Sequence, residues 1–280
     1  MKQRLFVTLS LAGLAMATFG ATKPKAAIKS LNKTTIQQPT YTEWHDLQVN
    51  AINRFPLHTN FFTYPADDWV SEKDGKIVSK DILHMNKTES KYFLSLDGTW
   101  KFNWVANADQ RPTDFYKEDL DDSNWKTMNV PGNWEMNGFG DPEYVNNGFA
   151  WREHFNEQPP AVPTKDNHVG SYRRIIDIPA NWDGKQVVAH FGSVTSNIYL
   201  YVNGKFAGYA EDSKVAAEFD ITPYLKKGKN LIAFQTFRWC DGSWDEDQDF
   251  WRLSGVARES YLFARDAKLH LEDIRVTPDL

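Results

Sequence analysis

From residue 91 onward, short runs of apolar and β-branched residues alternate with turn residues. Large apolar and polar side chains alternate through residues 100–104, which is the period of a half-buried strand. Asn203-Gly204 separates two such runs, and this dipeptide is typical of a two-residue hairpin turn. Helical periodicity is weak, although residues 114–120 could form one short helix. The pattern predicts an all-β, antiparallel β-sandwich over residues 91–265. Its other expected strands are 172–178, 186–191, 197–202, 230–239 and 259–263.

The first 20 residues have a different pattern. Lys2 and Arg4 precede an apolar or small stretch at residues 5–17, and Ala15 and Ala17 are small enough for a cleavage site. This layout predicts a secretory signal peptide over residues 1–20. The apolar stretch is shorter than the roughly 20 residues that a membrane-spanning helix needs. We therefore expect an exported protein, periplasmic or secreted, with no membrane span in its mature form.

The two segments that flank the predicted sandwich do not share its alternation. Residues 21–90 begin with a Lys- and Thr-rich leader and continue with scattered aromatics, which predicts an extended N-terminal arm anchored by those aromatics. A strand-like alternation starts again within residues 270–278 and the chain stops soon afterwards. We therefore expect residues 266–280 to begin a further domain of a longer protein.

Composition narrows the classes of function. Apolar residues make up 41% of the chain and charged residues 25%, which is unlike a disordered protein. The formal net charge of −5 argues against nucleic acid as a partner, since such binders need a basic face. The single cysteine, Cys240, leaves no internal disulfide. Aromatics reach 14%, which fits either a β core or a surface that stacks on planar or sugar ligands.

A first candidate sugar-binding segment covers residues 141–151. Asn146 and Asn147 are adjacent amides that offer donors and acceptors together, and aromatics flank them. The same Asn-Asn-Gly sequence is also good turn chemistry, and the residues alone favour a surface turn over a site.

A second candidate segment is the acidic loop, residues 238–252. It holds five carboxylates within nine residues, three Trp and two Arg. Oxygen ligands of this kind can bind hard cations, although the spacing is not that of an EF-hand. The alternative is a solvated loop whose charge is neutralised by Arg238 and Arg252. The three Trp argue against this alternative, because a solvated loop has little reason to carry large aromatic side chains. The carboxylates do not establish the fixed separation that a glycosidase pair requires, so no complete catalytic set is expected. The five are Asp241, Asp245, Glu246, Asp247 and Asp249.

Several motifs in order along the chain resemble one known family. They are similar to the N-terminal sugar-binding domain of family-2 glycoside hydrolases, and in particular to its long, five-domain β-galactosidases rather than its β-glucuronidases. Trp44 and Asn53-Arg54 also resemble the N-terminal arm of that group. The motifs are residues 95–102 (SLDGTWKF), 130–136 (VPGNWEM), 142–146 (PEYVN), 159–164 (PPAVPT), 170–172 (GSY), 208–213 (GYAEDS), 238–243 (RWCDGS) and 246–255 (EDQDFWRLSG).

The resemblance implies a galactose-binding-like jelly roll that is followed by an immunoglobulin-like domain from residue 266 and packs against a TIM barrel. It implies that Asn146 contacts the galactosyl unit, with Asn147 as an alternative. It also implies that Asp249 contacts the sugar and ligates Na⁺. Asp241 and Glu211 could join Glu43 or Asp46 in a structural Mg²⁺ site.

The implied function is that of the N-terminal part of an exported β-galactosidase, which hydrolyses terminal β-galactosides with retention. The catalytic glutamates would lie in the barrel, beyond Leu280, so we expect the chain alone to be inactive. Expected partners are a β-galactoside and the barrel, with a homo-oligomer possible. Two alternatives remain open, namely a stand-alone carbohydrate-binding module and a family-2 enzyme specific for another sugar.

Overall fold

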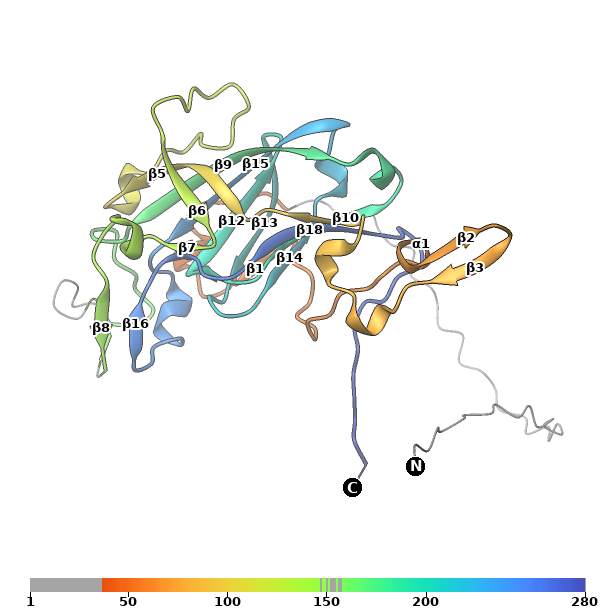
Figure 1. Ribbon diagram of the computed structural model, residues 1–280. Helices are drawn as coiled ribbons and strands as arrows, with labels where there is room; N and C mark the ends of the chain where they lie inside the picture. Colours follow the sequence, from red (N-terminus) through yellow and green to blue (C-terminus); the bar gives the residue numbers. More distant parts are fainter. Residues whose placement is uncertain (1–36, 147, 150, 152–154, 156–157, 280) are drawn as a thin grey trace, which may run out of the picture. The chain divides into compact units, whose positions relative to one another are not determined.

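The computed structural model describes residues 37–146, 148–149, 151, 155 and 158–279. The predicted signal peptide and the leader up to residue 36 lie outside these residues, and so does Asn147. Within the described part, the chain forms two antiparallel sheets that pack face to face (Figure 1). The prediction of an all-β, antiparallel sandwich is therefore confirmed.

The larger sheet has seven strands and the smaller has four. In spatial order, the larger contains β1 (Ala51–Ile52), β13 (Lys205–Glu211), β12 (Asn197–Val202), β15 (Gly228–Phe237), β9 (Val169–Ile178), β5 (Gly98–Val105) and β6 (Lys126–Val130). The smaller contains β14 (Ala217–Asp220), β10 (Gln186–Phe191), β18 (Ser260–Arg265) and β4 (Phe93–Ser95).

The remaining elements are short and lie mostly at the ends of the sandwich. Three small sheets pair β11 (Val194–Thr195) with β17 (Gly255–Val256) and β7 (Gly132–Asn133), β8 (Glu143–Val145) with β16 (Phe250–Arg252), and β2 (Val70–Lys73) with β3 (Lys76–Ser79). The one α-helix of the described residues is α1 (Ala66–Trp69). The 3₁₀ turns are Glu43–His45, Ile82–His84, Lys87–Glu89, Ala108–Gln110, Glu135–Asn137, Ala180–Trp182, Thr222–Tyr224 and Asp241–Trp244.

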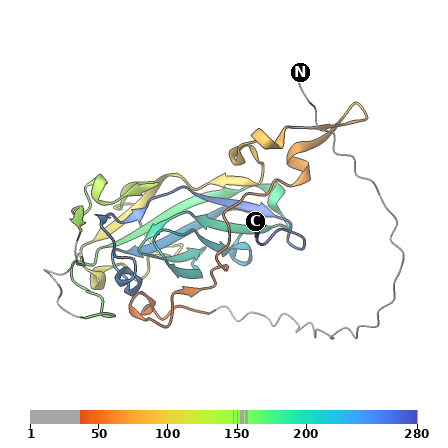
Figure 2. The same cartoon turned by 90° about the horizontal axis from the view of Figure 1, so that it is seen from below.

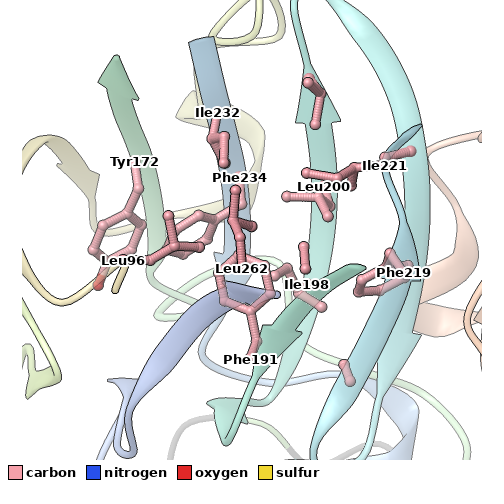
Figure 3. Packing of buried hydrophobic residues seen from close by; sticks show 14 of the residues in the cluster. Leu96, Tyr172, Phe191, Ile198, Leu200, Phe219, Ile221, Ile232, Phe234 and Leu262 are labelled. Carbon is pink, nitrogen blue, oxygen red and sulfur yellow. The ribbon is translucent and has the colours of Figure 1, made fainter. Parts of the chain in front are cut away.

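Both faces of the larger sheet are covered at strand β12, whose side chains are all buried and divide between two cores. Ile198 and Leu200 point between the sheets, where they pack with residues such as Phe191 (Figure 3). Tyr199 and Tyr201, which alternate with them, belong to a second apolar cluster on the opposite face. Successive side chains of a strand point to opposite faces, so an unbroken run of buried residues requires cover on both sides.

The N-terminal arm supplies much of the cover for the second apolar cluster, on the face of the larger sheet that points away from the smaller sheet. Trp44 stacks on Phe237 at a centroid distance of 5.0 Å, and β1 adds an edge strand to β13, with Ala51 opposite Ala210. Figure 2 shows this orange segment running along the sandwich. These contacts are of the kind expected for an arm anchored by aromatics, and the arm over residues 21–90 stays a prediction.

The predicted hairpin between β12 and β13 is also confirmed. Asn203 and Gly204 have φ angles of 50° and 76°, the left-handed conformation that a two-residue turn of this kind requires at both positions. The side chain of Asn203 is held in turn by the Tyr224 carbonyl at 2.8 Å and by Asn230 at 2.7 Å.

The short helix predicted at residues 114–120 does not form, and that prediction is wrong. The segment consists of turns. Its carbonyls at Phe115 and Lys117 instead accept hydrogen bonds from the buried guanidinium of Arg173, at 2.5 and 2.8 Å. A tertiary partner has outweighed the weak helical periodicity of the segment.

Residues 266–279 contain no strand in the described structure. Leu269 and Val276 are 85% and 81% exposed, and residues 266–279 join no sheet among the described residues. The further domain expected from residue 266 stays a prediction. None of the helices in the described residues is both long enough and apolar enough to cross a membrane.

Candidate sugar-binding site

Strands β8 and β16 bring the two predicted sugar-binding residues to one place. Val145 lies opposite Phe250 in the antiparallel ladder of this ribbon. Asn146 directly follows β8 and Asp249 directly precedes β16, so both lie at the same end of the ribbon. Figure 1 shows the two strands as a separate ribbon at one end of the sandwich. Both residues are exposed, so their polar groups are available to a ligand.

Two exposed aromatic rings stand beside Asp249. The hydroxyl of Tyr144 donates a hydrogen bond of 2.5 Å to Oδ1 of Asp249, and this bond raises the pKa of Tyr144. The ring of Tyr144 lies 5.5 Å from that of Trp251, its facing residue. The two side chains are 52% and 56% exposed. The ribbon therefore offers a carboxylate, an amide and two aromatic faces on one surface.

The carboxylates of the acidic loop have separate environments, unlike the uniform solvated loop considered above. Asp247 forms an ion pair with the buried guanidinium of Arg252. Oε1 of Glu246 accepts the backbone N–H of Ser213 at 2.9 Å. Asp245 and Asp249 are exposed, whereas Asp241 is buried. Only Asp245 and Asp249 thus fit the description of solvated charges.

The expected neutralisation of the loop by its two arginines is half correct. Arg252 pairs within the loop, but Arg238 reaches across to Glu143 of β8, with a distance of 3.2 Å between Nη2 and Oε1. Arg238 also donates to the carbonyl of Asp141 at 3.2 Å. This buried arginine therefore ties the start of the β8–β16 ribbon to the end of β15.

The tryptophans of the loop are explained by packing. Trp239 and Trp244 both pack edge-on against Trp151, at centroid distances of 5.0 and 4.8 Å. The indole N–H of Trp244 donates to the carbonyl of Ala161 at 2.9 Å. These rings hold the acidic loop against the segment before β9, and only the third tryptophan, Trp251, faces solvent.

A second polar cluster contains Glu211, Cys240 and Asp241, whose ligand atoms all lie within 4.8 Å of one another. All three residues are buried. Burial raises the pKa of Glu211 to about 8; a hydrogen bond from Tyr209 opposes this shift and the charge of Asp241 adds to it. Oδ2 of Asp241 is buried and has no hydrogen-bond partner in the described residues. Two close carboxylates with an orphaned oxygen are what a hard cation would relieve.

Asp46 and Glu43, the two other acids predicted for this cluster, differ in their surroundings. Asp46 lines the same groove of about 380 Å³ as Glu211 and Asp241. Glu43 has other partners, since Oε1 accepts from Thr40 at 2.5 and 2.8 Å and Oε2 accepts from Tyr199 at 3.0 Å. Although burial raises the pKa of Glu43, these hydrogen bonds outweigh it and lower the pKa. Of the two acids, Asp46 lies at the better place for a ligand.

Sequence reasoning missed Tyr144 as a partner of Asp249 and Glu143 as a partner of Arg238. Both residues lie in the PEYVN motif, but their roles depend on the pairing of β8 with β16, which joins segments about a hundred residues apart. The adjacent amide, Asn147, lies outside the described residues.

A β-sandwich that presents polar groups beside exposed aromatic rings has the character of a carbohydrate-binding domain. The sequence pattern of "Glycosyl hydrolases family 2, sugar binding domain" matches residues 93–266. The chain therefore belongs to glycoside hydrolase family 2, of which it carries the sugar-binding domain, as the motifs indicated.

Its relatives are much longer proteins. A β-galactosidase of Priestia megaterium is 36% identical over 241 residues, which cover 86% of this chain and 22% of the relative. A β-galactosidase of Lactobacillus delbrueckii subsp. bulgaricus is 39% identical, with 84% and 22% covered. A β-galactosidase large subunit of Leuconostoc lactis is 33% identical, with 83% and 36% covered. The chain thus spans between a fifth and two fifths of the length of these relatives.

Among solved structures, a β-glucuronidase of Bacteroides uniformis aligns with a TM-score of 0.45 and 22% identity, covering 61% of this chain and 18% of that one.

Proposed function

We propose that this chain is the N-terminal sugar-binding portion of an exported β-galactosidase, and that its β8–β16 ribbon forms part of the galactose subsite. The observation that carries the proposal is that Asn146 and Asp249 directly flank Val145 and Phe250, the last pair at one end of the same ribbon. The β-galactosidase names of relatives that cover most of this chain support the choice of sugar.

In this proposal Asn146 and Asp249 bind and orient the sugar. The Asp249 carboxylate accepts hydrogen bonds from sugar hydroxyls, while the Asn146 amide both donates and accepts. Tyr144 holds Oδ1 of Asp249 at 2.5 Å, which limits the rotation of the carboxylate. Because Oδ1 already accepts one bond, Oδ2 is the oxygen with the most capacity for a ligand.

Hydrolysis itself is assigned to residues of the longer protein. A retaining glycosidase needs two carboxyl groups about 5–5.5 Å apart across the scissile bond. Asp249 contacts a tyrosine hydroxyl, that of Tyr144, rather than a second acid, and Asp241 belongs to a buried cluster. We therefore propose that a TIM barrel of the full-length protein supplies both catalytic glutamates, and that the 280-residue chain alone is inactive.

Two cations fit the residues present. The exposed carboxylate of Asp249 suits Na⁺, which would add positive charge beside the sugar hydroxyls. Glu211 and Asp241, with Asp46 lining the same groove, suit Mg²⁺, because hard cations prefer carboxylate oxygens.

Export to the periplasm or medium rests on Lys2, Arg4 and the apolar stretch at residues 5–17.

The experiment compares the full-length protein with the 280-residue chain on a panel of nitrophenyl glycosides. We expect the full-length protein to hydrolyse the β-galactoside faster than the β-glucuronide and β-glucoside, and the short chain to show no turnover above a mock preparation. Preference for another glycoside would refute the sugar assignment. Turnover by the short chain would refute the assignment of catalysis to the barrel. If the gene ends at residue 280 and its product binds sugar without hydrolysing it, the stand-alone binding module would be favoured.

A further inference from the structure

A small cavity lies behind the β8–β16 ribbon, between the acidic loop and the sandwich. Its volume is about 30 Å³. Its lining includes Arg238 and Arg252, which hold the two strands of the ribbon through Glu143 and Asp247. We call it the arginine cavity. Its lining contains neither Asn146 nor Asp249 and neither Glu211 nor Asp241, although Glu246 lines both this cavity and the groove beside the Glu211–Asp241 cluster.

Five residues that line the arginine cavity have a buried polar atom with no hydrogen-bond partner in the described part of the chain. The atoms are Trp151 Nε1, Thr195 Oγ1, Ser213 Oγ, Arg238 Nε and Arg252 Nη1. Four of these residues are at least nine-tenths buried, with exposures of 5% for Trp151, 1% for Ser213, 3% for Arg238 and 6% for Arg252. Buried polar groups are normally hydrogen-bonded, so such a concentration at one cavity indicates a bound ligand.

The chemistry of these atoms selects an acceptor. Guanidinium and indole N–H groups can only donate, and the two hydroxyls can donate as well. A water molecule usually makes about three hydrogen bonds in all, and some of them must be donated, so one water would leave several donors unsatisfied. An anion accepts from every side.

Charge and size point the same way. The lining contains three cationic side chains, Lys214, Arg238 and Arg252, and two carboxylates, Glu246 and Asp247, so its formal charge is positive by one; Glu143, the partner of Arg238, lies outside the lining. The volume exceeds the roughly 10–15 Å³ that one water requires and leaves space for a single small ion. We propose that the arginine cavity binds a monovalent anion of about the size of chloride.

The position of the cavity gives the anion a structural role. Arg252 lies on β16 itself, and Arg238 directly follows β15. An anion between their free N–H groups joins the ribbon to the sandwich through a second set of bonds, besides the ion pairs with Asp247 and Glu143. Binding therefore stabilises the ribbon that carries Asn146 and Asp249, without contact with the sugar.

The direct test uses crystals of the full-length protein soaked in sodium bromide, because bromide gives an anomalous signal. We expect a peak in the arginine cavity within hydrogen-bond distance of Arg238 and Arg252. In solution, we expect the unfolding temperature to rise when chloride or bromide replaces gluconate at constant sodium and ionic strength.

A matched pair of variants ties the effect to the cavity. Trp151→Phe removes an orphaned indole N–H, whereas Trp244→Phe removes an N–H that donates to Ala161 at 2.9 Å in the same aromatic cluster. Trp151→Phe should weaken halide affinity at least about tenfold, the effect of losing one hydrogen bond to a charged group, and Trp244→Phe should leave the affinity unchanged. If Trp151→Phe does not fold, Thr195→Val provides the same comparison.

Three results would overturn the proposal. The first is the absence of a bromide peak together with an unfolding temperature that does not change when halide is added. Water would then be the occupant of the cavity. Another is a peak at crystal concentration with no halide response in solution, which would mean an adventitious ion only. The third is an equal loss of affinity in Trp151→Phe, or in Thr195→Val where that variant replaces it, and in Trp244→Phe.

Discussion

Replacement of Asp249 by alanine in the full-length protein is the sharpest test of the proposed subsite. The change removes a carboxylate that lies at the same end of the ribbon as Asn146 and accepts a 2.5 Å bond from Tyr144. It leaves both apolar cores untouched. We therefore expect a large loss of activity with little loss of stability.

The magnitude follows from the contacts that would be lost. A hydrogen bond to a charged group is worth about 1.5–3 kcal/mol, and each 1.36 kcal/mol in a barrier is about tenfold in rate. One such contact with the galactosyl unit therefore predicts a fall in kcat/KM of about one to two orders of magnitude, and the loss of a sodium ligand adds to it. The partner inside the chain, Tyr144, is 52% exposed, so unfolding free energy should change by only about 0.5 kcal/mol.

The assay measures kcat/KM on nitrophenyl β-galactoside at several sodium concentrations, together with thermal unfolding. Asp245→Ala is the matched control, because Asp245 is an exposed acid of the same loop. Glu246 would be a poor control, since it accepts the Ser213 N–H. Asn146→Ala should fall between the two, because a neutral hydrogen bond is worth only about 0.5–1.5 kcal/mol.

The activity of Asp249→Ala should also lose most of its response to sodium. If Asp249→Ala and Asp245→Ala have equal kinetics while both proteins are folded, the reasoning fails. The ribbon would then be a surface feature rather than a wall of the subsite.

Three further predictions concern the stability of the chain. Gly170→Ala should destabilise the fold by about 1–3 kcal/mol in chemical denaturation, because a Cβ there would lie 2.4 Å from the buried ring of Trp134. Mg²⁺ should raise the unfolding temperature and a chelator should lower it, whereas Glu211→Gln should abolish this response; a response that persists would exclude Glu211 as a ligand. Burial lowers the pKa of His58, but its hydrogen bond of 2.9 Å to Glu218 and its bond to a backbone carbonyl outweigh this and raise the pKa. The stability that His58 contributes should thus be complete below about pH 6.5 and decline as pH rises through the higher folded value, and His58→Gln should remove this decline in thermal unfolding measured against pH.

The sequence by itself determined the elements of this protein whose signals are local. The alternation at residues 100–104 predicts strand β5, and Asn203-Gly204 predicts the β12–β13 hairpin, because period and turn conformation depend on neighbouring residues. The motifs along the chain also identified the family. By contrast, the helix expected at residues 114–120 failed, since its carbonyls are bound by Arg173, a residue more than fifty positions away.

Only the tertiary structure decided which polar residues meet. Asn146 and Asp249 come to the same end of one ribbon because β8 pairs with β16, and a register shift of one residue would turn the side chains of a strand to the opposite face. The pairing of Arg238 with Glu143 and the proximity of Glu211 to Asp241 likewise join segments that are distant along the chain. Tertiary contacts also divide the acids of the loop: Asp241 is buried and Asp245 and Asp249 are exposed. Glu246 accepts the Ser213 N–H and Asp247 pairs with Arg252. Charge spacing alone carries no such information, because it records neither what covers a side chain nor which donor lies opposite it.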